Sequence, residues 1–186
     1  MPIGQAKFGL LGGVDLGSLE LIETQTASGA VVDFTNLGDY NVHLVTYNDI
    51  LLPNSTEEFQ SRLSNNSGTS FISTGYQYAI QYGGATGGFG ESKQTNYSSF
   101  PPLGPVGNAT NIKKNGYVYY YNLLDSSKYS FCTTHSSSNF TSFFQMLFGS
   151  GVLPTAETHN AIRFLTTGGN GITSGTMSLY GIKEYS

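Results

Sequence analysis

Apolar and polar residues alternate with a period of two along most of the chain, a pattern that is typical of half-buried β-strands. The clearest run is YQYAIQY at 76–82, where three tyrosines and Ile80 fall on one face and two glutamines and Ala79 on the other. About ten such segments are separated by turns of Gly, Asn and Ser. No segment has caps and a 3.6-residue apolar spacing long enough to predict a helix. The predicted strands are residues 19–24, 30–34, 40–52, 59–64, 76–82, 117–124, 128–134, 140–148, 160–166 and 175–182.

The spacing of these strands predicts an antiparallel β-sandwich or barrel, because stacking two sheets or closing one sheet protects the strand edges. A length of 186 residues fits a single domain. Charged residues make up 11% of the chain and aromatic residues 13%, whereas a disordered chain has few aromatic residues and a high net charge. A long helical bundle would need many more than the 8 Lys and Arg residues present. The composition therefore favours a folded all-β protein.

Two segments depart from the alternating pattern. The first is a Gly-rich N-terminal arm at 1–18, whose glycines make it costly to order alone. We expect the arm either to dock on the body or on a neighbouring subunit, or to fray as chain ends do. The second is a Gly- and Pro-rich stretch at 83–115, predicted as a long irregular loop of the sandwich domain 19–186, with room for one short strand. Loops of this length are often binding loops. The apolar residues of the arm, which would make the docking contacts, are Phe8, Leu10, Leu11 and Leu16.

The charge and the cysteine content exclude several classes of protein. The net charge is −4, and the only adjacent basic pair is Lys113–Lys114, whereas binding to nucleic-acid phosphates needs clustered Lys and Arg. The single cysteine, Cys132, excludes an internal disulfide and a cysteine-rich zinc site. The apolar run at the start is too short for a signal peptide, and no segment approaches the roughly 20 apolar residues of a membrane span. We expect a soluble protein made in the cytoplasm, with no nucleic-acid or membrane partner.

Residues with catalytic or metal-binding chemistry are scattered along the chain. Cys132 and His135 lie three positions apart in a predicted strand, so their side chains should point to opposite faces, and Cys132 fits a small core residue. The adjacent carboxylates Glu57 and Glu58 also point apart. The three histidines form no HxH or HExxH motif, which argues against a zinc site. We therefore predict no catalytic residue, no metal site and no cofactor.

Tyrosines are the most informative side chains, because a large ring with a polar tip suits interfaces and sugar-stacking surfaces. They form two groups in which alternate positions share one strand face. The alternative is that the rings only cover a face of the sandwich, with their hydroxyls in water. We expect this for most of them, with a subset in subunit or ligand contacts. The candidate residues are Tyr76, Tyr78 and Tyr82 in the first group and Tyr117, Tyr119 and Tyr121 in the second.

Three stretches carry a resemblance to proteins and domains of tailed bacteriophages. They are LELIETQTASGAVVDF near the start, GYVYYYNLLDSSKYSFCTTH in the middle and NAIRFLTTGGNGITSGTMSLYGIKE at the end. The last stretch resembles an ending of the form I-x-F-x-x-x-x-G-x-I-x-S-G-x-x-x-L-Y-G-I, with slightly different spacing. The resemblance spans nearly all of 19–184 and rests on structural positions. The matching residues are Ile162, Phe164, Gly169, Ile172, Ser174, Gly175, Leu179, Tyr180, Gly181 and Ile182.

The resemblance implies a virion-associated β-sandwich of jelly-roll type, in which the first and last strands often pair. We therefore expect residues 19–24 to lie antiparallel to 176–182. The implied function is non-enzymatic: a virion protein, made in the host cytoplasm, that decorates the capsid or accompanies the tail and docks on major capsid or tail proteins. Repeated copies on a particle suggest a homo-oligomer, and a trimer is expected. One alternative is a tail-fibre module that recognises a host-surface glycan. Another is a hydrolase, since jelly rolls also host enzymes.

Overall fold

The computed structural model describes residues 18–183 apart from 56, 102, 105, 107, 110, 141 and 142. The described part contains eleven β-strands, all paired antiparallel, and no helix. Ten of them correspond to the ten predicted segments. The strands are β1 (Leu19–Thr26), β2 (Val32–Phe34), β3 (Val42–Leu51), β4 (Phe59–Ser64), β5 (Tyr76–Gly84), β6 (Phe89–Tyr97), β7 (Lys114–Tyr121), β8 (Ser130–Phe140), β9 (Phe143–Leu153), β10 (Ala161–Thr166) and β11 (Ser174–Ile182).

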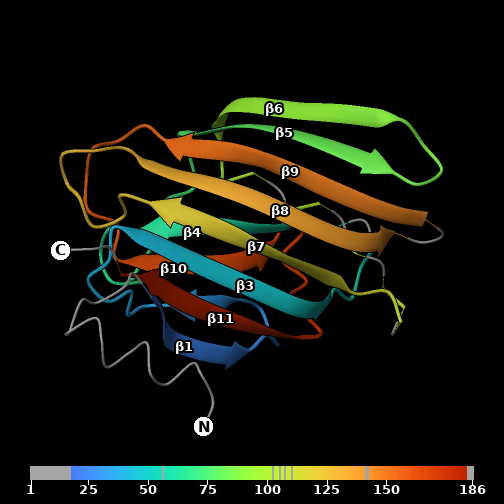
Figure 1. Cartoon of the computed structure of the whole chain (residues 1–186), viewed down its shortest axis with the longest axis horizontal. Coiled ribbons are helices and arrows are strands. Elements are labelled where there is room, and N and C mark those ends of the chain that lie inside the picture. The colour runs from blue at the N-terminus through green and yellow to red at the C-terminus, as the bar shows by residue number, and fades with distance from the viewer. Residues whose placement is uncertain are drawn as a thin grey trace, which may run out of the picture.

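The strands form two sheets of unequal size, which confirms the predicted all-β antiparallel sandwich. The large sheet has eight strands in the order β1-β11-β3-β7-β8-β9-β5-β6, and the small sheet has the order β2-β10-β4. In Figure 1 the small sheet lies behind the β7, β3 and β11 region of the large sheet, whereas β6 extends beyond it. The near face of the large sheet in that view, which we call the outer face, has no strand of the described chain over it.

Aromatic rings fill the space between the two sheets. Phe59 of β4 stacks on Phe164 of β10 with their ring centroids 5.4 Å apart, and Tyr47 of β3 meets Phe59 edge-on at 5.6 Å. Fully burying such a ring stabilises the fold by about 1.5–3 kcal/mol. The hydroxyl of Tyr120 donates a 2.7 Å hydrogen bond to the Ser61 hydroxyl across the gap. The core therefore joins β3 and β7 of the large sheet to β4 and β10 of the small one.

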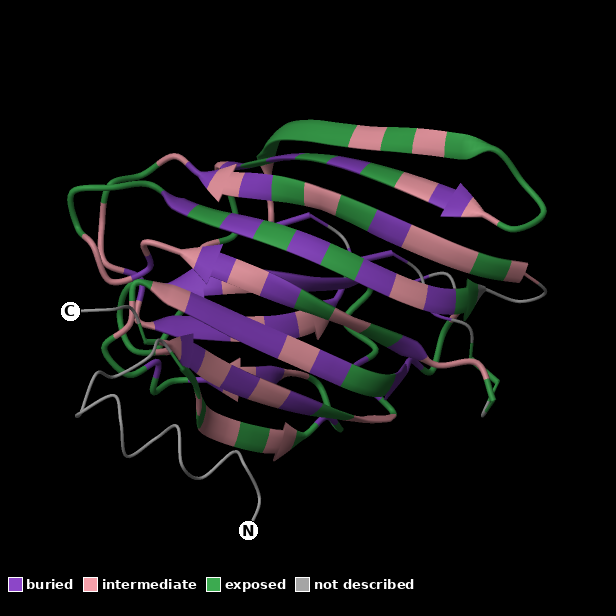
Figure 2. Ribbon diagram, in the orientation of Figure 1, coloured by how far each residue is buried: buried purple, intermediate pink, exposed green. Residues whose placement is uncertain are grey.

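The first and last strands pair as predicted. Leu19 lies opposite Ile182, and the antiparallel register continues to Thr26 opposite Thr176, with one irregularity between Leu21 and Glu23. This pairing makes β1 an edge strand of the large sheet. Burial alternates along β5, β7, β8 and β11 as predicted, and the banded ribbons of Figure 2 show it, whereas β4 is buried at nearly every position. The arm residues Phe8, Leu10, Leu11 and Leu16 lie outside the described residues.

The stretch 83–115, predicted as a long irregular loop with room for one short strand, contains the nine-residue strand β6. The sequence did not show where this strand lies, because it is the other edge of the large sheet and most of its side chains are exposed, so no apolar alternation marks it. Part of the loop that follows β6 packs on the small sheet. Its backbone amides at Phe100 and Leu103 donate to the carbonyls of Ser61 and Phe59 on β4, and both side chains are buried. At these positions the loop is part of the core and not a free binding loop.

Candidate functional site

The outer face of the large sheet carries the most exposed aromatic side chains of the described chain. The strand register places residues from β8, β9 and β5 in straight rows across this face. One row is Thr133, Ser150 and Ala79, and it continues to Lys93 on β6. The two rows beside it contain Phe131 and Phe148, whose side chains are 43% and 41% exposed.

These rows form a shallow depression, which we call the outer groove. Its floor is Thr133, Ser150 and Ala79, and Phe131 and Phe148 stand on opposite sides of the floor. Two adjoining hollows of about 660 and 390 Å³ meet at Ser150. Adjacent strands lie about 4.8 Å apart, so the four strands from β8 to β6 give a floor on the order of 14 Å long. The groove is therefore long enough for a chain-like ligand.

The polar groups of the outer groove carry no net charge. Lys93 at its β6 end forms a 2.9 Å ion pair with Glu91, and this hydrogen bond raises the pKa of the Lys93 ammonium. The side-chain amides of Gln77 and Gln81 are exposed on β5, one on each side of Ala79, and no hydrogen bond joins them to the described residues. The groove thus combines exposed rings with hydroxyl and amide groups.

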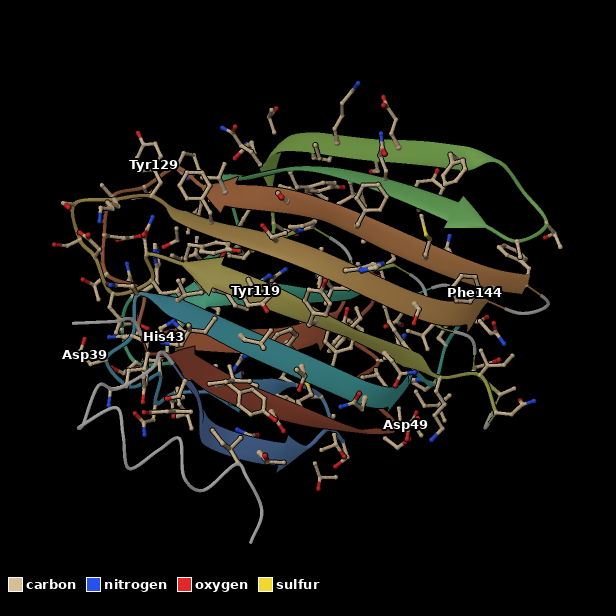
Figure 3. The ribbon with its side chains drawn as sticks, in the orientation of Figure 1. Asp39, His43, Asp49, Tyr119, Tyr129 and Phe144 are labelled. Carbon is tan, nitrogen blue, oxygen red and sulfur yellow. The ribbon has the colours of Figure 1, made fainter. Side chains whose placement is uncertain are left out.

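The predicted tyrosine group on β7 lies on the outer face. The rings of Tyr117 and Tyr119 meet edge-on at 5.6 Å, and Tyr119 stacks beside Tyr121 at 6.4 Å. Tyr119 lies directly opposite Thr133, so it stands at the β7 end of the groove floor. Figure 3 shows Tyr119 near the middle of the sheet and Phe144 near the β8–β9 turn. That these rings take part in contacts with a partner or a ligand stays a prediction.

The other predicted group faces the interior, so the expectation of surface contacts is wrong for two of its members. Tyr76 is fully buried, and its hydroxyl accepts a 2.8 Å hydrogen bond from the Leu63 amide on β4. Tyr78 is buried beside Ile80, and only Tyr82 is partly exposed. Alternation showed that these residues share one face of β5, but it did not show that this face is the inner one.

The β1 edge of the same sheet exposes two leucines. The side chains of Leu19 and Leu21 are 53% and 60% exposed, and they lie opposite Ile182 and Tyr180 of β11, respectively. Within the described chain β1 pairs only with β11, so it is an edge strand of the large sheet. The edge strand of a sheet is a template for pairing with another chain.

A serine, a histidine and a carboxylate also meet in the structure, away from the outer face of the large sheet. The Ser130 hydroxyl lies 2.8 Å from Nδ1 of His159, and Nε2 of that ring lies 3.2 Å from Oε1 of Glu157. Ser130 and His159 are fully buried, so the hydroxyl cannot meet a substrate. Sequence reasoning missed this cluster because 29 positions separate the serine from the histidine. The contacts tie the segment before β10 to the start of β8.

The other candidates for chemistry lie apart. Cys132 faces the core and His135 lies on the outer face, as their spacing predicts. Burial raises the pKa of the Cys132 thiol. Among residues 18–183 as described, no three His, Cys, Asp or Glu side chains gather closely enough to hold a metal ion. Nor does that part of the chain contain a helix with the length and apolar character needed to cross a membrane.

Comparison with known proteins returned no relative. No family model matches the chain, and no curated protein or solved structure matches it.

Proposed function

We propose that the chain is a non-enzymatic structural protein of a tailed-bacteriophage virion, a capsid-decoration or tail-accessory subunit that docks on other virion proteins. The observation that carries the proposal is the β1 edge, where Leu19 and Leu21 are exposed on a strand that pairs only with β11 within the described residues. The arm at 1–18, with its four large apolar residues, directly precedes this strand in the sequence. A partner at this end of the large sheet can therefore contact the edge leucines and the arm together.

The energetics of this contact are those of ordinary apolar docking. Burying one exposed leucine stabilises a complex by about 1.5–3 kcal/mol. A stable interface of ordinary size covers about 800 Å² of each partner. The edge leucines with the arm residues supply apolar groups for such an area. Copies placed at symmetric positions on a particle would form a closed oligomer, for which we propose a trimer.

The chemistry of the described side chains supports a non-enzymatic role. In the Ser–His–Glu cluster described above the serine and the histidine are buried, and the serine hydroxyl has no access to solvent. The outer groove contains hydroxyls, amides and one ion pair, without an acid and a base placed to act on a common atom.

The test is to locate the chain on particles of the phage that encodes it. We expect it to sediment with virions through a density gradient and to appear at repeated positions on head or tail in particle images. Detection of the chain only in the soluble fraction of the lysate would refute the proposal.

A second experiment asks whether the β1 end makes the contact. Deletion of residues 1–18, or the double change Leu19→Ser and Leu21→Ser, should reduce incorporation into particles while the sandwich stays folded. Phe89→Ser, at an exposed position on the opposite edge strand β6, is the matched control and should incorporate normally. Equal incorporation of all these proteins would show that docking uses another surface.

A further inference from the structure

We propose that the outer groove binds an uncharged polysaccharide. Binding sites for small molecules and chains are concave, with apolar walls and a few polar groups that fix the orientation of the ligand. In this groove Phe131 and Phe148 provide the walls, while the hydroxyls of Thr133 and Ser150 lie on the floor.

The rows on the two sides of the floor each contain one phenylalanine and one glutamine. On one side the row contains Phe131, Val152 and Gln77, and on the other it contains His135, Phe148 and Gln81. Each side therefore presents an exposed phenyl ring and, farther along the row on β5, a glutamine amide that makes no hydrogen bond to the described residues. The flat apolar face of a sugar ring can stack on such a phenyl ring, and its hydroxyl groups can exchange hydrogen bonds with the amides and the floor.

The charge distribution selects against other chain-like ligands. Glu91 neutralises Lys93 at 2.9 Å, so the groove offers no excess positive charge to a nucleic acid or to an acidic polymer. A protein partner favours a contact whose centre is apolar and depleted of polar side chains. Here the centre is the hydroxyl pair of Thr133 and Ser150, whose oxygens are 3.4 Å apart. An uncharged, hydroxyl-rich chain matches this arrangement best.

The groove lies toward the β6 end of the large sheet, and the exposed leucines lie on β1 at the opposite edge. A subunit anchored at its β1 end would thus keep the groove free. The binding proposal does not depend on that anchoring, because the groove belongs to a single chain.

The test is an array of purified bacterial polysaccharides probed with the full chain. We expect binding to at least one uncharged polysaccharide, weakened tenfold or more by Phe131→Ala and by Phe148→Ala. Phe144→Ala is the matched control, because Phe144 is equally exposed on the outer face of β9 but does not line the groove. It should bind like the unchanged chain.

A variant that blocks the groove without removing a ring makes the test independent of the phenylalanines. Ala79 is exposed on the floor, so Ala79→Arg should leave the melting temperature unchanged and abolish binding. Absence of any array signal, binding only to charged polysaccharides or peptides, or undiminished binding by Ala79→Arg would overturn the proposal. Particle fractionation reports only on docking, so the failure of either proposal can be recognised separately.

Discussion

The guanidinium of Arg163 on β10 donates two parallel hydrogen bonds, each 2.7 Å long, to the carboxylate of Asp33 on β2. The two residues lie directly opposite in the small sheet. The same guanidinium lies 4.0 Å above the centre of the Phe71 ring. Strand β2 is only three residues long, so this bidentate pair adds to the buried side chains of Val32 and Phe34 in holding it at the edge of the small sheet.

Arg163→Lys should therefore destabilise the fold although it keeps the charge. A lysine cannot form the planar two-bond contact and cannot stack its charge on Phe71 in the same way. The loss should be about 1 kcal/mol, since the pair is partly exposed to solvent. Urea denaturation measures it as a lower midpoint with an unchanged slope. Lys93→Arg, at an exposed ion pair, is the control and should not move the midpoint. An equal midpoint for Arg163→Lys would show that the ion pair adds nothing to the backbone pairing of β2 and the burial of Val32 and Phe34.

A second prediction concerns Lys114, which is almost fully buried at the start of β7. Burial lowers the pKa of its ammonium from 10.5 to about 7, and the nearby charge of Glu58 only partly opposes this. The unfolded chain therefore binds more protons than the folded chain between pH 7 and 10.5, so stability should rise with pH across that window.

Lys114→Met should remove this rise. It should also increase the free energy of unfolding near pH 7 by about 1–3 kcal/mol, because an apolar side chain of similar length carries no desolvation cost. Denaturation at a series of pH values gives both quantities. The curves of the variant and the unchanged chain should converge as the pH approaches 10.5. A constant separation between them would mean that Lys114 stays charged in the folded protein.

The alternation of side chains predicted most of the strands and the residues that share a face, because it reflects the geometry of a strand itself. Tyr117, Tyr119 and Tyr121 illustrate this, and so does the separation of Cys132 from His135. The same pattern could not show which face turns inward. Tyr76 is buried because β4 packs against its side of β5, and that contact depends on residues far away in the chain.

The candidate site could not be predicted for a related reason. The outer groove exists because Thr133, Ser150 and Ala79 come into register across three strands. A shift of one residue in either pairing would turn one of these side chains to the core. The tyrosines marked β7 as a surface of interest, but the two phenylalanines of the groove carried no separate signal. Strand β6 also stayed hidden, since an edge strand with mainly exposed side chains has no apolar face.

A third prediction concerns acid. His43 is fully buried, its Nε2 donates a 2.8 Å hydrogen bond to the Leu37 carbonyl, and burial lowers the pKa of its imidazole below 6.5. Below pH 6.5 the unfolded chain binds a proton that the folded chain resists, so stability should fall as the pH drops through and below this value.

His43→Gln separates this effect from general acid denaturation. The variant should be less stable than the unchanged chain at pH 7, and the difference in free energy of unfolding should shrink toward pH 5. His159, whose pKa burial also lowers, should cause part of the loss in both proteins and cancels in the comparison. A difference that stays constant with pH would show that His43 binds a proton equally well in the folded and unfolded chains.

The last prediction tests the orientation of β8, on which both the core and the outer groove depend. Cys132 points inward and is buried, and burial raises the pKa of its thiol, so little of it is thiolate and little is accessible. A thiol reagent such as DTNB should leave the native protein unmodified for as long as it stays folded and should modify one cysteine when guanidinium unfolds it. Thr133→Cys is the matched control, because this neighbouring side chain is exposed on the groove floor and its thiol should react at once. Rapid reaction of the unchanged protein would place Cys132 on the outer face, shift the whole strand by one residue and remove the groove.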